Sequence, residues 1–441
     1  MNFAQAERYV LAGISEAKSP RTNYGLGRMR ALLAALGDPH LSYPVVHVAG
    51  TSGKGSTATM IASALAEHAL RVALHVKPHL RSMTERARVD GAAISPERFA
   101  ELLTEMLPKI EEIAKRYGHP SYYEMLLALT FLYFARESVD VAVVEVGLGG
   151  RLDGTNVVAP CVCAITSIGF DHQDILGESL DLIAAEKAGI AKRGVPLVST
   201  VEEEPARSVI AQSAARVGAP LIESTTRSQI SNVVNDPYAQ RFVVETECAR
   251  YRISLPLLGA FQRTNAVTAI LSLEALPDEL RPSVEEIERG FAGVQIPGRM
   301  ELFPGSPPLL FDIAHNEQKA RSLAVSIGER FSGRRRIYVM SVGESKDARA
   351  ILAALAHPDA YFIFTRFSAA GREANDPHVL AALAREAGLD FEIEGDPLRA
   401  LARARDEARE QGIVVVTGST FIVAALREAV LQTRDGAYRY H

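Results

Sequence analysis

The sequence predicts an α/β protein in which a P-loop-containing, mostly parallel sheet domain is followed by a smaller, Rossmann-like α/β domain. Short apolar runs alternate with helical stretches, and many of the runs end in glycine or polar residues, as buried parallel strands do. The chain has 441 residues, more than one ordinary core accommodates. We therefore expect two domains, an ATP-binding domain over 1–298 and a C-terminal domain over 299–441.

The first domain is expected to carry most of the sheet. Its predicted strands are 45–49, 139–146, 161–168 and 195–201, with helices over 56–68 and 123–135. The segment 233–257 is richer in polar and β-forming residues, which predicts an antiparallel excursion. Pro297 and Gly298 break the preceding helix, so 294–299 is expected to be a hinge.

Beyond the hinge the alternation restarts, which predicts the second sheet. The expected strands are 309–313, 336–340, 360–364, 391–393 and 413–417, separated by helical stretches such as 348–355 and 398–409.

Composition limits the partners and the compartment. The chain is 47% hydrophobic and 23% charged, with a net charge of −5, so no global attraction to nucleic acid or to an anionic membrane is expected. We expect no signal peptide, because the first residues lack a basic region followed by a long apolar run, and no bilayer-spanning segment, because no apolar run is long enough. Three cysteines without a framework (Cys161, Cys163 and Cys248) suit a reducing cytoplasm, and the first two are expected in the core. We expect a cytoplasmic monomer with small-molecule partners.

The strongest local signal is a glycine-rich loop between a predicted strand and a predicted helix. It reads Gly50-Thr51-Ser52-Gly53-Lys54-Gly55-Ser56-Thr57. Backbone N–H groups of such a loop point at phosphate oxygens, a lysine reaches the outer phosphates, and a hydroxyl meets the metal ion. The generic pattern G-x-x-x-x-G-K-[ST] is not matched, because Val48 takes the place of its first glycine and Gly55 follows the lysine. The alternative is a glycine-rich turn that binds nothing.

Glu145 ends a predicted buried strand, where a bare carboxylate is costly unless it meets a cation. A magnesium ion that bridges ATP phosphates would supply that cation.

The loop resembles the G-T-N-G-K-G-S loop of the folylpolyglutamate synthase/dihydrofolate synthase family, within the Mur ligase superfamily, with Ser52 in place of asparagine. Further motifs match in order along nearly the whole chain. They are Tyr24–Met29, Pro78–Leu80 with Thr84–Arg86, Glu145–Asp153 with Thr155 and Asn156, Ser167–His172, Glu186–Ile190, Pro297–Arg299, Asp312–Asn316 and Thr417–Ser419.

The resemblance implies ATP-dependent ligation of L-glutamate to dihydropteroate, to tetrahydrofolate or to both, through an acyl phosphate, with ATP and Mg²⁺ as cofactors. It implies that ATP is held by Gly50, Thr51, Ser52, Gly53, Lys54, Gly55, Ser56, Asn265, Arg299 and Asp312, and Mg²⁺ by Ser56, Glu145 and His172. The catalytic residues implied are Lys54, Lys187 and His315, and the substrate-binding residues are Lys77, His79, Arg86, Asp153, Asn316 and Ser419.

Several of these assignments have a simpler alternative. Lys187, which carries a carbamate in the family, could be a partly exposed helix lysine, and His172 a hydrogen-bonded loop residue. For Arg299, Asp312, His315 or Asn316 taken singly, a salt bridge or a helix cap is the simpler explanation.

The chain departs from the family at two positions. Lys77 stands where a serine helps to bind magnesium, and an ammonium group cannot ligate a metal. Either its charge replaces part of one metal site, or the side chain turns to solvent and a water fills the gap. Phe261 stands where histidine is common, and it is expected to pack in the core rather than to stack on adenine.

Two other functions stay open from the sequence. One is a related Mur-type ligase that acts on a different carboxylate. The other is a nucleotide-binding regulatory protein without catalysis, against which Lys54, Glu145, His172, Lys187 and Asp312 argue by their presence.

Overall fold

The computed structural model describes residues 1–12, 25–236, 238–368 and 373–433. The chain divides into two compact units. The first comprises Met1–Val233, Arg241–Leu255 and Phe261–Val294, and the second comprises Val234–Gln240, Pro256–Ala260 and Gln295–His441. The longest segment of the second unit begins at Gln295, close to the predicted boundary after residue 298. The functions assigned to 1–298 and 299–441 stay predictions.

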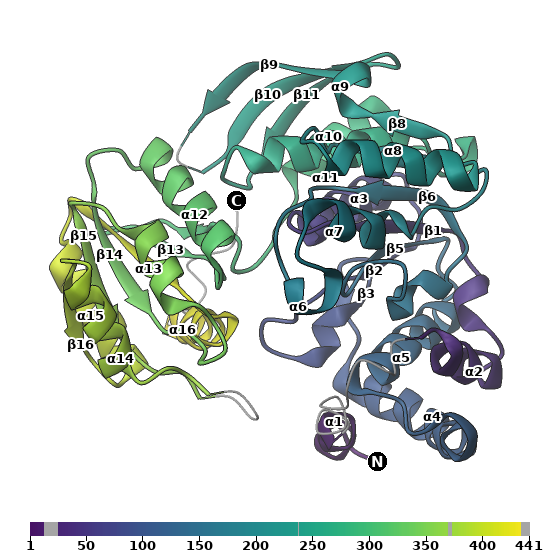
Figure 1. The fold of residues 1–441 in the computed structure, drawn as a ribbon, viewed down its shortest axis with the longest axis horizontal. Helices are drawn as coiled ribbons and strands as arrows, with labels where there is room; N and C mark the ends of the chain where they lie inside the picture. Colours follow the sequence, from purple (N-terminus) through teal and green to yellow (C-terminus); the bar gives the residue numbers. More distant parts are fainter. Residues whose placement is uncertain (13–24, 237, 369–372, 434–441) are drawn as a thin grey trace. The chain divides into compact units, whose positions relative to one another are not determined.

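The first unit is built on an eight-stranded sheet with the order β4-β3-β2-β5-β1-β6-β7-β8 (Figure 1). Strands β2, β5, β1, β6, β7 and β8 run parallel, whereas β3 and β4 are antiparallel additions at one edge. The strands are β1 Val45–Ala49, β2 Val72–His75, β3 Ala87–Val89, β4 Ala92–Ala93, β5 Val141–Glu145, β6 Pro160–Ile165, β7 Leu197–Ser199 and β8 Leu221–Glu223. The order reverses on the two sides of β1, so its carboxyl end is a topological switch point, where α/β proteins bind ligands.

Helices surround this sheet and close its core. They are α1 Phe3–Ala12, α2 Gly27–Ala35, α3 Lys54–Glu67, α4 Pro96–Tyr117, α5 Tyr122–Arg136, α6 Gln173–Leu176, α7 Leu180–Ala188, α8 Ala206–Val217, α9 Ser224–Arg227, α10 Phe261–Glu274 and α11 Val284–Ala292. Short 3₁₀ turns lie at Pro39–Leu41, Met83–Arg86, Gly154–Val157 and Asp278–Leu280. Helix α5 begins with a capping box between Ser121 and Glu124 and is buried on nearly every side.

The predicted excursion is a separate three-stranded sheet with the order β11-β10-β9 (Figure 1). Its strands are β9 Ser228–Asn235, β10 Gln240–Thr246 and β11 Arg250–Leu255. Turns of a few residues join neighbouring strands, which only an antiparallel arrangement allows.

The second unit contains a six-stranded sheet with the order β12-β13-β17-β14-β15-β16. Only β12 is antiparallel to its neighbour. The strands are β12 Glu301–Phe303, β13 Leu309–Phe311, β14 Arg335–Met340, β15 Ala360–Phe364, β16 Asp390–Ile393 and β17 Gly412–Thr417. The helices are α12 Glu317–Arg330, α13 Ala348–Leu355, α14 Pro377–Glu386, α15 Pro397–Ala408 and α16 Thr420–Thr433.

The predicted α/β class and its parallel sheets are confirmed. The predicted strand 161–168 ends earlier, at Ile165, and the predicted helix 56–68 begins earlier, at Lys54. Cys163 lies in the core, Cys161 is partly buried and Cys248 is exposed, all as free thiols. Within the described residues, no helix combines the length and the apolar character needed to cross a bilayer.

Candidate functional site

The glycine-rich loop leaves the carboxyl end of β1 and leads into α3, and two of its glycines are required by their surroundings. Gly50 has φ +146°, and a Cβ placed on it would lie 2.0 Å from Thr166 Oγ1. Gly53 has φ +84°, and its Cβ would lie 2.1 Å from Asn265 Oδ1. The loop therefore follows a path that only glycine can take at these two positions.

The segment after β6 anchors this loop. Ser167 accepts the N–H of Thr51 on its carbonyl oxygen (2.7 Å) and the N–H of Ser52 on its hydroxyl (3.0 Å). The Thr166 hydroxyl donates to the carbonyl oxygen of Ser52 (2.6 Å). These bonds engage the two hydroxyl residues that directly follow the end of β6 at Ile165. Thr166 was not among the predicted site residues, because the predicted strand 161–168 placed it inside the strand, whereas β6 ends at Ile165.

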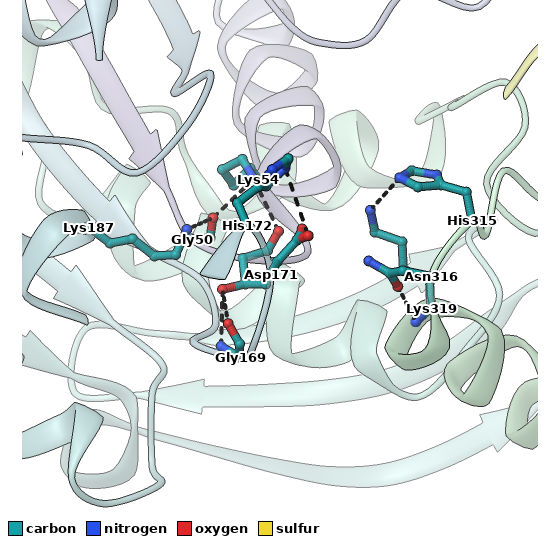
Figure 2. A network of polar contacts seen from close by, with 10 residues as sticks. Gly50, Lys54, Gly169, Asp171, His172, Lys187, His315, Asn316 and Lys319 are labelled. Carbon is teal, nitrogen blue, oxygen red and sulfur yellow. Dashed lines mark hydrogen bonds and ion pairs between the residues drawn. The ribbon is translucent and has the colours of Figure 1, made fainter. Parts of the chain in front are cut away.

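Two lysines converge on one carbonyl oxygen of the loop. The ammonium group of Lys54 donates to the oxygens of Gly50 (3.0 Å) and Thr51 (3.1 Å), and Lys187 from α7 donates to the oxygen of Gly50 (2.9 Å) (Figure 2). Lys187 is 4% exposed, so the alternative of a partly exposed helix lysine is wrong. Its burial, and then the charge of Lys54, lower its pKa to about 7. Two cationic side chains at one loop favour an anion there.

Glu145 lies against the first turn of α3. It is 4% exposed, its Oε2 accepts the N–H of Lys77 (2.9 Å), and a Cβ on Gly55 would be 3.2 Å from the same oxygen. Ser56, also buried, follows in that turn. A carboxylate against this turn and a hydroxyl within the turn are oxygen donors of the kind that magnesium prefers. In the described part of the chain no three acidic, histidine or cysteine side chains form a metal-binding group, so phosphate and water oxygens would have to complete such a site.

His172 occupies an exposed turn rather than a buried position. Its backbone has φ +52°, its side chain is 45% exposed, and Nε2 lies 3.8 Å from Asp171 Oδ1 (Figure 2). Its assignment as a magnesium ligand stays a prediction.

The predicted substrate loop has an internal contact of its own. Arg86 donates from Nε to His79 Nδ1 (3.0 Å), and its guanidinium lies 5.5 Å from the centroid of the Tyr122 ring. Burial and the Arg86 charge lower the pKa of His79 to about 4, so this imidazole is neutral and carries its proton on Nε2. Tyr24, the first residue of the opening motif, lies outside the described residues.

Asp153 is buried and held by four donors. They are the Tyr123 hydroxyl (3.1 Å), the Thr155 hydroxyl (2.6 Å), the Thr155 N–H (3.0 Å) and the Leu148 N–H (2.7 Å). The carboxylate organises the loop that follows β5. A contact with substrate stays a prediction, and Tyr123 is a partner that was not predicted from the sequence.

In the second unit, Asp312 directly follows β13, and each of its carboxylate oxygens accepts a hydrogen bond from a backbone N–H group. Its Oδ1 accepts the N–H of Ala314 (2.8 Å) and its Oδ2 accepts the N–H of Met300 (2.9 Å). Burial raises the pKa of this carboxyl above its usual value, and the nearby charge of Arg299 opposes that rise. The nucleotide contacts predicted for Arg299 and Asp312 stay predictions.

His315 is fixed as a neutral imidazole. Its Nδ1 donates to the carbonyl oxygen of Ile313 (2.8 Å), which leaves Nε2 to accept from the ammonium group of Lys319 (3.3 Å) (Figure 2). Burial, and then Lys319, lower the pKa of His315 to about 3. Lys319 was not among the predicted residues, although its position four residues after His315 was a usable signal.

Two further predicted residues act as local caps. Asn316 Oδ1 accepts the N–H of Lys319 (3.0 Å) and caps α12, and the Ser419 hydroxyl accepts the N–H of Phe421 (3.2 Å). Both side chains retain further hydrogen-bonding capacity, so their substrate contacts remain predictions.

Phe261 corrects one expectation. It is the first residue of α10 and 40% exposed, so the prediction that it packs in the core is wrong. Asn265, one turn later, is buried, approaches Gly53 and donates to Gln262 Oε1 (2.9 Å).

Comparison with known proteins gives the family. Residues 48–273 match the Mur ligase middle domain, and residues 298–420 match the Mur ligase glutamate ligase domain. The dihydrofolate synthase/folylpolyglutamate synthase of Bacillus subtilis is 36% identical over 92% of this chain and 94% of its own length.

Solved structures agree over nearly the whole chain. Mycobacterium tuberculosis folylpolyglutamate synthase complexed with ADP superposes with a TM-score of 0.88 at 32% identity, over 98% of each chain. Escherichia coli FolC in complex with DHPP and ADP gives 0.85 at 28% identity, over 99% of each chain. This chain therefore belongs to the folylpolyglutamate synthase/dihydrofolate synthase family of Mur ligases, and it is an ATP-dependent ligase.

Proposed function

We propose that this enzyme joins L-glutamate to dihydropteroate and to tetrahydrofolate, with poly-γ-glutamates as products of the second activity. The observation that carries the proposal is the convergence of Lys54 and Lys187 on the loop after β1. The relatives support the substrate class, since the Bacillus subtilis protein is named for both activities and FolC is seen with DHPP and ADP.

The loop would bind the triphosphate. The N-terminus of α3 offers its backbone dipole to phosphate oxygens, and Lys54 exchanges its carbonyl partners for the outer phosphates. Ser56 and Glu145, with His172, would hold Mg²⁺, which offsets phosphate charge when bound. From the second unit, Arg299 would donate hydrogen bonds to phosphate oxygens, and Asp312 would accept hydrogen bonds from the ribose hydroxyls.

The reaction needs the acid to be activated before the amine attacks. An oxygen of the substrate carboxylate bonds to the γ-phosphorus while the bond to ADP breaks, which gives an acyl phosphate. The neutral amino nitrogen of glutamate then bonds to the acyl carbon, phosphate leaves, and the amine proton goes to solvent. Lys54 stabilises the charge that moves with the phosphoryl group, so catalysis depends on positioning and electrostatics.

Lys187 can supply a second function at this loop. A pKa of about 7 leaves a large neutral fraction of its amine at neutral pH, and only a neutral amine reacts with CO₂ to form a carbamate. We propose that Lys187 is carbamylated, which would turn one of two neighbouring cations into an anion that orients a metal ion or a water.

We further propose that the enzyme is a cytoplasmic monomer that handles only small molecules. Catalysis through an acyl phosphate requires that water be excluded from the site. We propose that a closing movement at the 294–299 segment excludes it.

The test is ADP formation with defined acid and amine pairs. We expect turnover with dihydropteroate plus glutamate and with tetrahydrofolate plus glutamate, and none with a muramyl peptide. Turnover with the muramyl peptide alone would favour a ligase for another carboxylate. Binding of ATP without turnover in any pair would favour a regulatory protein.

A further inference from the structure

The backbone N–H groups of the residues before and after Arg299 each donate a hydrogen bond to a carboxylate. The N–H of Gly298 donates to Glu301 Oε2 (2.8 Å), and the N–H of Met300 donates to Asp312 Oδ2 (2.9 Å). The carbonyl oxygen of Gly298 accepts the N–H of Ile313 (2.9 Å). The peptide units on either side of Arg299 are thus fixed within the second unit.

This grip holds an uncommon backbone shape. Gly298 has φ +68° and Met300 has φ +49°, and Met300 is buried at 3% exposure. A left-handed conformation is unfavourable for a non-glycine residue, and it persists only where the surroundings enforce it. The antiparallel pair of β12 and β13 begins at Glu301 opposite Phe311, so the strained turn directly precedes the first strand of this hairpin.

Glu301 is itself locked by a second residue. Arg427 of α16 donates from Nε to Oε2 (2.7 Å) and from Nη2 to Oε1 (2.8 Å), and the two side chains are 17% and 11% exposed for Arg427 and Glu301. A two-point arginine–carboxylate pair fixes direction as well as distance. A mostly buried pair of this kind stabilises little by itself, so its value lies in the geometry that it imposes.

Arg299 lies close enough to two other predicted residues of this unit to act on them electrostatically. Its charge acts on both Asp312 and His315, and among the described residues it has no hydrogen bond or ion pair of its own. The geometry points to Glu301 as a positioning residue, which, locked by Arg427, aims Arg299 at the nucleotide phosphates. This inference rests on the nucleotide-binding role proposed for Arg299.

The test is a double-mutant cycle read by ADP affinity in the purified full-length protein. E301Q keeps the size of the side chain but weakens both the pair with Arg427 and the grip on Gly298. We expect it to weaken ADP binding about tenfold and to raise the KM for ATP with little change in kcat, because a phosphate-binding group that is displaced from its position loses part of its contact with the bound nucleotide. In an R299A background the same change should have no further effect.

The control is E386Q, which breaks the exposed pair of Glu386 and Arg349 in the same unit and should leave ADP affinity unchanged. R427K keeps the charge but loses the two-point geometry, and it should show the same loss in weaker form. Should E301Q fail to fold in a circular dichroism melt, R427K carries the test alone.

Unchanged ADP affinity in folded E301Q and R427K would overturn the inference while leaving the role of Arg299 intact. An equal loss from E301Q in the parent and R299A backgrounds would also overturn it. If R299A itself binds ADP normally, the proposed role of Arg299 fails and the positioning role of Glu301 fails with it.

Discussion

Lys54 and Lys187, from two different helices, donate to the same carbonyl oxygen of Gly50, at 3.0 and 2.9 Å. The mutual repulsion of the two ammonium groups is one cause of the lowered pKa of Lys187, after burial. This repulsion is relieved either when an anion binds beside the two ammonium groups or when one of the two lysines becomes neutral.

This relationship predicts a bicarbonate-dependent activity. Lys187 has its pKa lowered to about 7, so its amine is mostly protonated below that pH and mostly neutral above it. Activation by added bicarbonate should therefore rise as pH increases through about 7, the range in which the reactive neutral amine appears. Initial rates of ADP formation with and without bicarbonate measure this. K187R stays protonated and should show no bicarbonate effect.

The close approach of Asn265 to Gly53 predicts a stability effect that a second substitution relieves. G53A would place a Cβ 2.1 Å from Asn265 Oδ1 and also suffers the strain of a positive φ. We expect G53A to lower the free energy of unfolding by about 2–4 kcal/mol, as measured by urea titration. In an N265A background, which removes the obstructing atoms, the loss should shrink to the strain alone.

Gly194 offers a matched control, since it has φ +73° and a Cβ placed on it would meet nothing within 4 Å. G194A should cost only about 1–2 kcal/mol. Equal losses for G53A and G194A would show that no clash with Asn265 exists.

The sequence could predict much of the fold because buried parallel strands leave continuous apolar runs. The run at 45–49 is such a strand, and the polar, β-rich segment 233–257 separates correctly as a second sheet. Strand ends were less predictable. Thr166 and Ser167 look like a continuation of their strand, but their hydroxyls are needed by the glycine loop.

Site residues were predictable by type but not by partner. The sequence points to His315 and Asp153, yet it does not show that Lys319 fixes one imidazole or that Tyr123 and Thr155 surround the carboxylate. Phe261 was misplaced because an aromatic residue in an apolar helix usually packs inward. Here it is the first residue of α10, before the buried face begins. Such contacts depend on the tertiary fold rather than on local pattern.

Two buried histidines predict a loss of stability in acid. His47 and His75 pair with the same residue, Val144 of β5, are fully buried, and have pKa values lowered to about 3, chiefly by burial. Each folded pKa lies below the unfolded value of about 6.5. The contribution of these neutral histidines to the free energy of unfolding is thus fully present above about pH 6.5. It falls as the pH decreases toward 3, because unfolding then takes up protons.

Between about pH 6 and pH 4 each such histidine should contribute about 1.4 kcal/mol per pH unit to the slope of the unfolding free energy. Urea titrations across this range compare the parent with H47N and H75N. Each variant should take up one proton fewer on unfolding, so its unfolding free energy should depend less steeply on pH. A parent-like slope in both buried variants would contradict the buried, neutral state of these rings.

Lys77 predicts an altered metal requirement. Its N–H donates to the carboxylate of Glu145 (2.9 Å), and its charge also contributes to the lowered pKa of Lys187. The backbone of Lys77 therefore lies beside the predicted metal ligand, and an ammonium group carried there could neutralise phosphate directly where a hydroxyl would instead bind a second ion. We expect K77S to need a second Mg²⁺, seen as a steeper and right-shifted dependence of ADP formation on magnesium concentration. K77M, which removes the charge without supplying a ligand, should lose activity at every magnesium concentration. If K77S keeps the magnesium dependence of the parent, Lys77 points to solvent and the substitution carries no electrostatic role.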